Sequence, residues 1–183
     1  MSAAINKIRT LSIEEYLEAE SKGPIKHEYV DGYVYAMVGT SKPHNTIVVN
    51  LASALRGHLR GGPCRVFVVD IKVQIASRFY YPDVIVSCER DKDPYVETKP
   101  RLVIEVLSDS TERIDRQEKK PAYQQLVSLQ EYVLVAQDRM EVQIYRRTGI
   151  DWELKTYHEN EQVELASVGL TLPIEQIYED VEL

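Results

Sequence analysis

The stretch Tyr80–Ser87, with the sequence YYPDVIVS, and the later stretch Arg101–Leu107, with the sequence RLVIEVL, decide how this chain folds. Both are rich in Val and Ile, which favours strands in the core of a sheet. Each carries one carboxylate, Asp83 in the first and Glu105 in the second. A buried carboxylate is costly unless a hydrogen-bonded base, a cation or a metal ion compensates it. A strand end that reaches solvent would explain either residue singly, but the pair, with Pro82 directly before Asp83, is more specific.

The sequence before these stretches predicts helices, a hairpin and a long strand. Ser12 followed by Glu15 is a capping-box pattern, which marks the start of a helix. Asp31-Gly32 between two β-rich runs is typical of a tight hairpin, and apolar residues recur at helical spacing after Pro43. The predicted elements are a helix at 13–21, a hairpin within 26–39, a helix at 43–59 and a strand at 64–75.

The sequence after the second stretch predicts one helix and several more strands. Asp109 with Glu112 repeats the capping signal, so a helix should run from there to about Val127. Pro121 lies inside it and removes one backbone donor. The helix therefore either kinks there, or ends near Lys120 and restarts with Pro121 at its first position. The remaining predictions are a polar loop at 88–100, strands at 131–136, 141–146 and 151–157, and a short helix at 173–179.

The order of these elements predicts a mixed α+β fold. A helix that joins two strands is what a parallel pair of strands requires. No repeat or low-complexity stretch divides the 183 residues, so one domain over residues 1–183 is expected. The chain has twelve Tyr against two Phe and one Trp. Such amphipathic rings suit half-exposed strands and interfaces, or simply replace Phe in the sheet.

Composition limits the classes of protein that the chain can belong to. A net charge of −7 argues against coating nucleic acid through general positive charge, although a local basic patch or a metal ion could still meet phosphates. Cys64 and Cys88 lack the spacing of a zinc site, and two cysteines make no disulfide framework, so a cytoplasmic location is expected. The N-terminal residues have no apolar core, and no run is long enough to span a membrane.

Several segments together resemble the PD-(D/E)XK nuclease superfamily. Pro82-Asp83, with Glu105 twenty-two residues later, gives the superfamily pattern. HEYVDGYVYAM, LVIEVLSDST and DRQEKKPAYQQLVSLQEYVLV then resemble its widespread restriction endonuclease family of small bacterial proteins, over about residues 10–180. The resemblance implies a restriction endonuclease-like core, in which helices flank a mixed sheet, and hydrolysis of phosphodiester bonds with a divalent metal.

The resemblance also implies a catalytic set of Asp83, Glu105 and Lys119. Carboxylate oxygens are the ligands that Mg²⁺ prefers, so Asp83 and Glu105 are the predicted ligands of Mg²⁺ or Mn²⁺. The superfamily has lysine two residues after the glutamate, where this chain has Leu107, and the resembled family carries it on the following helix instead. Lys119 occupies that place, with Lys120 as a competitor. The alternative is that ERIDRQEKK is merely a solvated helix face.

Glu28 and His44 are supporting candidates. By the resemblance, Glu28 in the hairpin approaches the site, where it could add a carboxylate to the metal or only hydrogen-bond a neighbour. His44 at a helix start could bind phosphate when protonated or support the metal ligands. A lone histidine is more often structural.

The leading hypothesis is a metal-dependent endonuclease that hydrolyses DNA through a metal-activated water. Duplex cleavage needs two sites, which suggests a homodimer. The acidic composition and the lysine missing beside Glu105 favour the alternative of a nuclease fold that binds nucleic acid or protein without cutting. A phosphodiesterase acting on a small nucleotide or on RNA is a weaker third reading.

Overall fold

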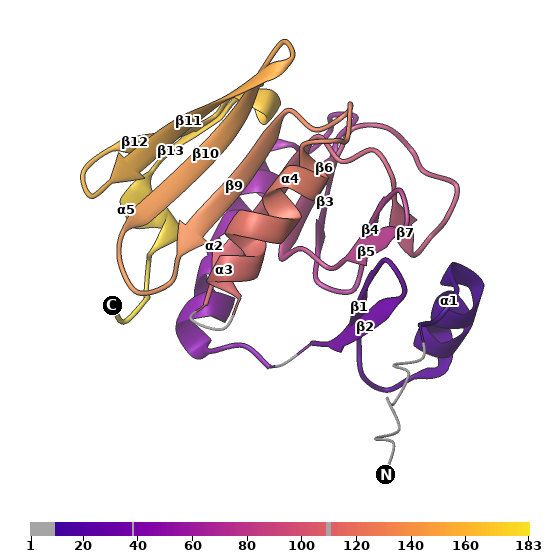
Figure 1. Ribbon diagram of the computed structural model, residues 1–183. Helices are drawn as coiled ribbons and strands as arrows, with labels where there is room; N and C mark the ends of the chain where they lie inside the picture. Colours follow the sequence, from indigo (N-terminus) through magenta and orange to yellow (C-terminus); the bar gives the residue numbers. More distant parts are fainter. Residues whose placement is uncertain (1–9, 38, 109–110) are drawn as a thin grey trace.

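Two β-sheets organise the computed structural model of the protein, which describes residues 10–37, 39–108 and 111–183 (Figure 1). The larger sheet has six strands in the order β11-β10-β9-β8-β6-β3. Its strands are β3 (Arg65–Val68), β6 (Val84–Ser87), β8 (Leu102–Leu107), β9 (Glu131–Ala136), β10 (Glu141–Thr148) and β11 (Asp151–His158). Only β8 and β9 run parallel within it, so the sheet is mixed.

The smaller sheet has five strands in the order β2-β1-β5-β4-β7. They are β1 (His27–Val30), β2 (Tyr33–Ala36), β4 (Lys72–Ile75), β5 (Arg78–Tyr80) and β7 (Val96–Glu97). A separate hairpin pairs β12 (Gln162–Leu165) with β13 (Leu170–Pro173). The helical segments are α1 (Ile13–Lys22), α2 (Lys42–His58), α3 (Glu112–Ile114), the π-helix η1 (Asp115–Lys119), α4 (Lys120–Tyr123), the 3₁₀ turn η2 (Ala166–Val168) and α5 (Ile174–Ile177).

Helices cover the six-stranded sheet on both faces, α2 behind it and α3 with α4 in front (Figure 1). Residues of β8 alternate between the two faces. Leu102, Ile104 and Val106 pack in the cluster that contains α2, whereas Val103 and Leu107 pack with α4. Each fully buried aliphatic side chain contributes about 1.5–3 kcal/mol relative to exposure. Glu105 belongs to the second set by alternation, so its carboxylate points toward the helical segment that follows β8.

The predicted mixed α+β class is confirmed, and most predicted elements exist. The helices near 13–21 and 43–59, the hairpin about Asp31-Gly32 and the strands at 101–107, 131–136, 141–146 and 151–157 appear with small shifts of their ends. The terminal helix is only α5, and Tyr80–Ser87 divides into the end of β5, three residues that belong to neither strand, and β6. The strands β7, β12 and β13 were not predicted.

The single strand predicted at 64–75 is wrong. The chain breaks at Val69 and Asp70, whose φ angles are +46° and +62°. The segment before the break is β3 of the larger sheet, and the segment after it is β4 of the smaller one. A β-branched residue is a poor candidate for positive φ, so the sequence gives no turn signal there. The Val69 N–H donates to the Asp83 carbonyl at 3.3 Å, which ties the break to the strand that carries the acid.

The helix predicted from Asp109 to about Val127 is shorter and differently wound. Asp109 and Ser110, the predicted cap, lie outside the described residues. The helical run covers 112–123 as α3, η1 and α4 without a break. The Lys120 N–H donates to the Asp115 carbonyl, a wide π-type turn directly before Pro121. The α-helical winding resumes as α4 at Lys120 with Pro121 in its first turn, close to the predicted restart, although no residue separates α4 from η1.

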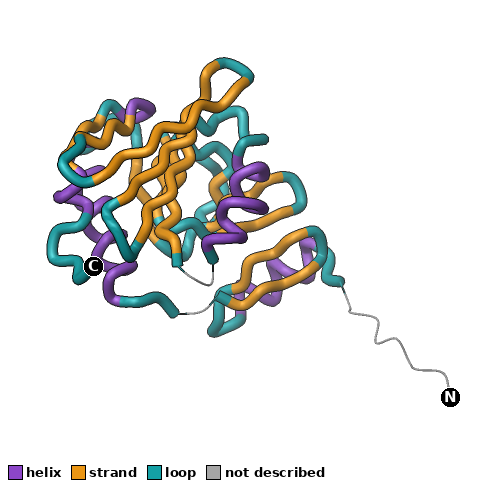
Figure 2. The backbone as a smooth tube through the Cα atoms, turned by 60° about the vertical axis from the view of Figure 1, so that its left-hand side comes forward, coloured by secondary structure: helices purple, strands orange, loops and turns teal. Residues whose placement is uncertain are grey.

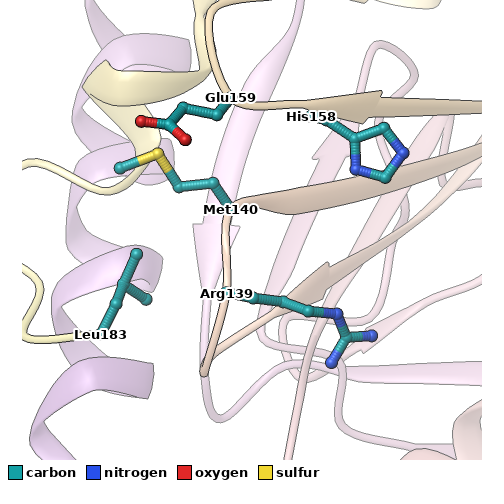
Figure 3. A pocket seen from close by; sticks show the side chains of 5 residues that line it. All are labelled: Arg139, Met140, His158, Glu159 and Leu183. Carbon is teal, nitrogen blue, oxygen red and sulfur yellow. The ribbon is translucent and has the colours of Figure 1, made fainter.

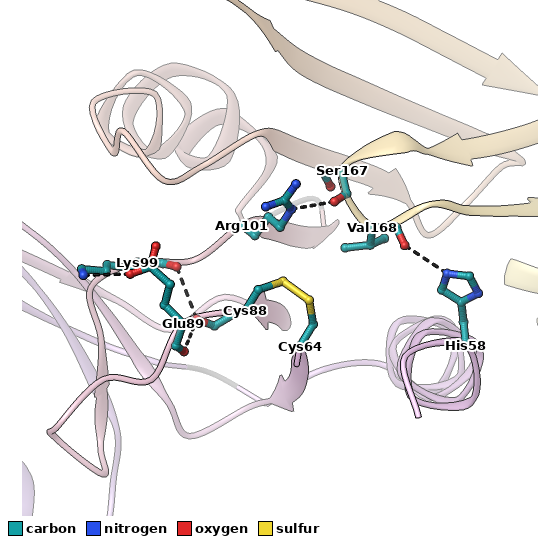
Figure 4. Close-up of a disulfide and its surroundings, with 9 residues drawn as sticks. His58, Cys64, Cys88, Glu89, Lys99, Arg101, Ser167 and Val168 are labelled. Atoms are coloured by element: carbon teal, nitrogen blue, oxygen red, sulfur yellow. Dashed lines mark hydrogen bonds and ion pairs between the residues drawn. A yellow bond between two sulfur atoms is a disulfide. The ribbon is translucent and has the colours of Figure 1, made fainter. Parts of the chain in front are cut away.

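A disulfide joins Cys64 and Cys88, although the two cysteines alone indicated no disulfide framework (Figure 4). The two cysteines follow the β3–β6 ladder, since Arg65 pairs with Ser87 and the next position outward pairs Cys64 with Cys88. Only strand register brings them together, so spacing in the sequence could not reveal the pair. Among the described residues, no helix has the length and apolar character needed to cross a membrane.

Candidate active site

Strand register places Asp83 and Glu105 directly across from each other. Val84 of β6 pairs with Ile104 of β8 in an antiparallel ladder, so the residue before Val84 faces the residue after Ile104. Directly opposite side chains share a face and have Cβ atoms about 4.5–5.5 Å apart. A hydrogen bond fixes the geometry, because the Val106 N–H donates to Asp83 Oδ2 at 2.7 Å. The two predicted acids therefore converge on one face of the larger sheet.

Glu105 is buried and has polar partners on the helical segment. Lys119 Nζ lies 3.3 Å from Glu105 Oε1, and the Tyr123 hydroxyl donates to the same oxygen at 3.4 Å. Among the described residues, every hydrogen bond to this carboxylate reaches Oε1, so Oε2 is left for another ligand. Burial raises the pKa of Glu105 well above its ordinary value, and the Lys119 charge opposes that rise. A cation near Oε2 would therefore stabilise the charged form.

Lys119 is held by three carboxylates. Its Nζ lies 2.9 Å from Glu28 Oε1, 3.2 Å from Asp115 Oδ1 and 3.3 Å from Glu105 Oε1. The side chain is 7% exposed, so the ammonium is almost fully removed from water. Burial alone would lower the pKa of Lys119, but the surrounding carboxylates raise it well above its ordinary value. The three carboxylates thus stabilise the charged form of this lysine and surround its ammonium group.

The π-helix explains how a run of charged residues delivers one lysine into the interior. Asp115 and Lys119, at the two ends of η1, are both buried. The Tyr132 hydroxyl of β9 donates to the Asp115 carbonyl at 3.1 Å, which anchors the widened turn against the sheet. π-Turns inside helices are frequent at functional sites. Lys120, the competitor, lies outside the cluster, with its Nζ 4.6 Å from the centre of the Tyr145 ring.

His44 reaches the other oxygen of Asp83 from the start of α2. Ser41 caps that helix by accepting from the His44 N–H at 3.2 Å, and the His44 Nε2 lies 3.0 Å from Asp83 Oδ1. The ring is 7% exposed, and its Nδ1 has no hydrogen-bond partner within the described part of the chain. Two donors thus orient Asp83, the Val106 N–H at one oxygen and His44 at the other.

Glu28 links the site to the smaller sheet. Its Oε1 contacts Lys119 and accepts from the Tyr81 N–H at 3.2 Å, two residues before Asp83. Asp83, at 18% exposure of its side chain, and Glu28, at 15%, are more open than Glu105 at 5% and Asp115 at 2%. A ligand would therefore enter on the side of Asp83 and Glu28.

The cluster carries more negative than positive charge. Four carboxylates (Glu28, Asp83, Glu105 and Asp115) face one ammonium and one imidazole in the described part of the site. Among the described residues, no three acidic, histidine or cysteine side chains form a metal cage by themselves. Mg²⁺ typically takes one or two protein carboxylates and fills its other positions with water and phosphate oxygens. The pair Asp83 and Glu105 fits that requirement, and a bound cation would offset the excess charge.

All five predicted site residues lie in this cluster, and sequence reasoning missed some of their partners. Asp115 was not predicted as a site residue, although it is a buried member of the cluster. Tyr132 was not predicted to support the site, because nothing in the sequence links it to Asp115, 17 residues earlier. A surface hollow of about 430 Å³ lies elsewhere, lined by Arg139, Met140, His158, Glu159 and Leu183 (Figure 3). Its open, mostly apolar walls lack any converging acids, so the cluster is the better candidate.

Comparisons with known proteins identify the family of this chain. The model of the Uma2 family, described as “Putative restriction endonuclease”, matches residues 13–175. Two uncharacterised proteins of Synechocystis sp. are similar over most of their lengths. The protein slr1290 is 42% identical, and the match covers 92% of this chain and 91% of slr1290. The protein sll1609 is 33% identical, and the match covers 81% of this chain and 86% of sll1609.

A solved structure from Anabaena variabilis has the same fold. It is described as a “putative nuclease belonging to DUF820” and superposes with a TM-score of 0.77, covering 92% of this chain and 97% of its own. The two sequences are 18% identical, so the likeness concerns the fold. The family match confirms the resemblance to PD-(D/E)XK nucleases that the sequence predicted. The chain belongs to the Uma2 family of restriction endonuclease-like proteins.

Proposed function

We propose that the protein is a metal-dependent endonuclease that hydrolyses phosphodiester bonds of DNA. One observation carries the proposal: Asp83 and Glu105 lie opposite each other across two strands, with the buried ammonium of Lys119 3.3 Å from Glu105. Membership in a restriction endonuclease family supports it. A purely structural network would have no need for an excess of buried carboxylates, each of which is costly to bury.

The site residues divide into metal ligands, a lysine that stabilises negative charge, and groups that position these side chains. Asp83 and Glu105 would hold Mg²⁺ or Mn²⁺, which would supply Lewis-acid activation of water and of the phosphodiester. The positive charge of Lys119 would stabilise the negative charge that grows on the phosphate oxygens in the transition state. Glu28 and Asp115 hold Lys119 in place, and His44 with the Val106 N–H orients Asp83.

The exposure of the site indicates how the substrate approaches. The two more open carboxylates, Asp83 and Glu28, mark the entrance, so the phosphate would meet Asp83 first and Lys119 behind it. Cleavage of both strands of a duplex would require two such sites, and a homodimer would supply them. A single chain is enough to nick one strand.

A plasmid assay tests the proposal. Supercoiled DNA is incubated with the purified protein and Mg²⁺ or Mn²⁺, beside Asp83→Asn, Glu105→Gln and Lys119→Met. We expect wild type to nick the plasmid, EDTA to abolish nicking, and each variant to lose roughly 100-fold or more of the rate.

The matched control is Glu131→Gln. Glu131 is also fully buried in the larger sheet, but Arg146, the Ser167 hydroxyl and the Ser167 N–H satisfy its carboxylate far from the cluster. We expect this variant to keep its nicking activity. Equal activity in wild type, Asp83→Asn and Glu105→Gln would reveal a contaminating nuclease and refute the assignment. An inactive wild type that still binds DNA would support the non-cutting alternative.

A further inference from the structure

The outer strand of the smaller sheet exposes an unusual amount of aromatic surface. β2 is an edge strand whose four residues are all exposed. Tyr33 is 45% exposed and Tyr35 is 53% exposed. Large rings left in water on a strand are costly and often mark a binding surface. Figure 2 shows the β1–β2 hairpin standing at the rim of the molecule.

Strand register puts these two rings on the face that contains the candidate active site. Tyr35 pairs with Glu28 and Tyr33 pairs with Val30 in the β1–β2 ladder. Opposite residues share a face and have Cβ atoms about 4.5–5.5 Å apart. Glu28 in turn lies 2.9 Å from Lys119. Tyr35 is therefore the next side chain outward from the cluster, on the side where Asp83 and Glu28 open to solvent.

The remaining packing of the hairpin does not account for these rings. On the opposite face, Tyr29 stacks on Tyr16 of α1 at 4.8 Å between ring centres, so α1 covers that side. Another strand could pair with the free edge of β2 and satisfy the backbone groups there. Such pairing would still leave the Tyr33 and Tyr35 rings uncovered, because they project from the face of the sheet. The ligand that covers Tyr33 and Tyr35 has to lie over the active-site face.

We propose that Tyr35, with Tyr33 beside it, forms a stacking platform for unpaired bases of a single-stranded DNA segment next to the scissile phosphate. This inference rests on the proposed function and narrows its substrate. In a duplex the bases already stack on one another, so only unpaired or splayed bases offer a free face to an aromatic ring. The substrate is thus single-stranded DNA or the unpaired part of a duplex.

The negative charge of the protein leaves stacking as the main source of affinity for such a platform. At a net charge of −7 the chain gains little affinity from phosphates, which other nucleic-acid-binding proteins obtain from clustered Lys and Arg. Stacking acts on every base and does not depend on positive charge. Affinity for single strands should therefore fall less steeply with salt than it does for a basic protein.

A binding experiment tests the platform separately from cleavage. The full chain carrying Glu105→Gln, which blocks cutting, is titrated into a fluorescein-labelled single-stranded DNA of mixed sequence, and anisotropy gives Kd. We expect Tyr35→Ala in this background to weaken binding roughly 5- to 100-fold, and Tyr35→Trp to preserve it because the larger ring also stacks. Binding to a blunt duplex of the same sequence should be weaker and insensitive to Tyr35→Ala.

The control is Tyr95→Ala. Tyr95 is 67% exposed directly before β7, at the edge of the smaller sheet opposite to β2, and its loss should leave Kd unchanged. Equal binding by the background and Tyr35→Ala would overturn the platform, and so would an equal loss in Tyr95→Ala. If wild type with Mg²⁺ or Mn²⁺ cleaves neither the plasmid nor the labelled single strand while Tyr35-dependent binding is intact, the nuclease proposal is refuted and the platform stands.

Discussion

Replacing Lys119 with Met would test the buried network through stability. The Met side chain is similar in length to that of Lys but carries no charge. The substitution therefore removes the positive charge that Glu28, Glu105 and Asp115 share. Removing one partner of a buried ion pair costs about 3–5 kcal/mol, because the remaining charge is left uncompensated. In a chain of this size 1 kcal/mol shifts Tm by about 2–4 °C, so we expect a decrease of roughly 6–20 °C at pH 7.5.

The loss should depend on pH in a defined direction. Burial already raises the pKa of Glu105 and of Asp115 in the folded protein, and the Lys119 charge opposes both rises. Without the lysine both folded-state pKa values rise further. A carboxyl whose pKa is higher in the folded than in the unfolded state stabilises the fold only when protonated, so stability falls as pH rises between the two values. The variant should therefore lose less stability at pH 5 than at pH 7.5.

Thermal unfolding of both proteins, followed by circular dichroism at the two pH values, measures this difference. Lys120→Met is the matched control, because that neighbouring lysine lies over the Tyr145 ring outside the cluster. Its Tm should change by only a few degrees, as expected for a partly exposed cation–π contact. A Lys119→Met protein with wild-type stability at both pH values would refute the buried network.

Other predictions concern the supports of the site and the disulfide. Tyr132→Phe removes the hydroxyl that donates to the Asp115 carbonyl and should lower stability by about 0.5–1.5 kcal/mol in urea unfolding, with an unchanged value contradicting the anchored π-turn. His44→Ala should retain the fold but weaken Mn²⁺ binding about 10- to 100-fold in calorimetry, since it orients Asp83; unaltered affinity would exclude that role. The Cys64–Cys88 link closes a separation of 24 residues, so reduction should cost roughly 3 kcal/mol, whereas a reduced protein with the same Tm would contradict a stabilising link.

The acid pair could be predicted from the sequence because it interrupts apolar strands. Asp83 and Glu105 stand among Val and Ile, where a carboxylate demands an explanation, and the ladder places them across from each other. The helices near 13–21 and 43–59 follow from local caps and periodicity, which depend on neighbours in the chain. Local signals were sufficient for these features.

The parts that sequence could not predict depend on contacts between distant segments. ERIDRQEKK has the composition of a solvated helix face, yet the sheet draws Asp115 and Lys119 inward through a π-turn held by Tyr132. The break at Val69 is set by the chain leaving one sheet for another, against the preference of a β-branched residue. Only the resemblance favoured Lys119 over Lys120 as the site lysine. The structure gives the physical reason, because three carboxylates surround the ammonium group of Lys119.

The most direct test of the central claim is a titration with Mn²⁺ followed by electron paramagnetic resonance. Asp83 and Glu105 should together hold one Mn²⁺ per chain, in competition with Mg²⁺. Glu105→Gln and Asp83→Asn should each lose the bound signal, whereas Glu131→Gln, whose buried carboxylate is already satisfied by Arg146 and Ser167, should keep it. Equal binding of Mn²⁺ by wild type and the two site variants would contradict the account.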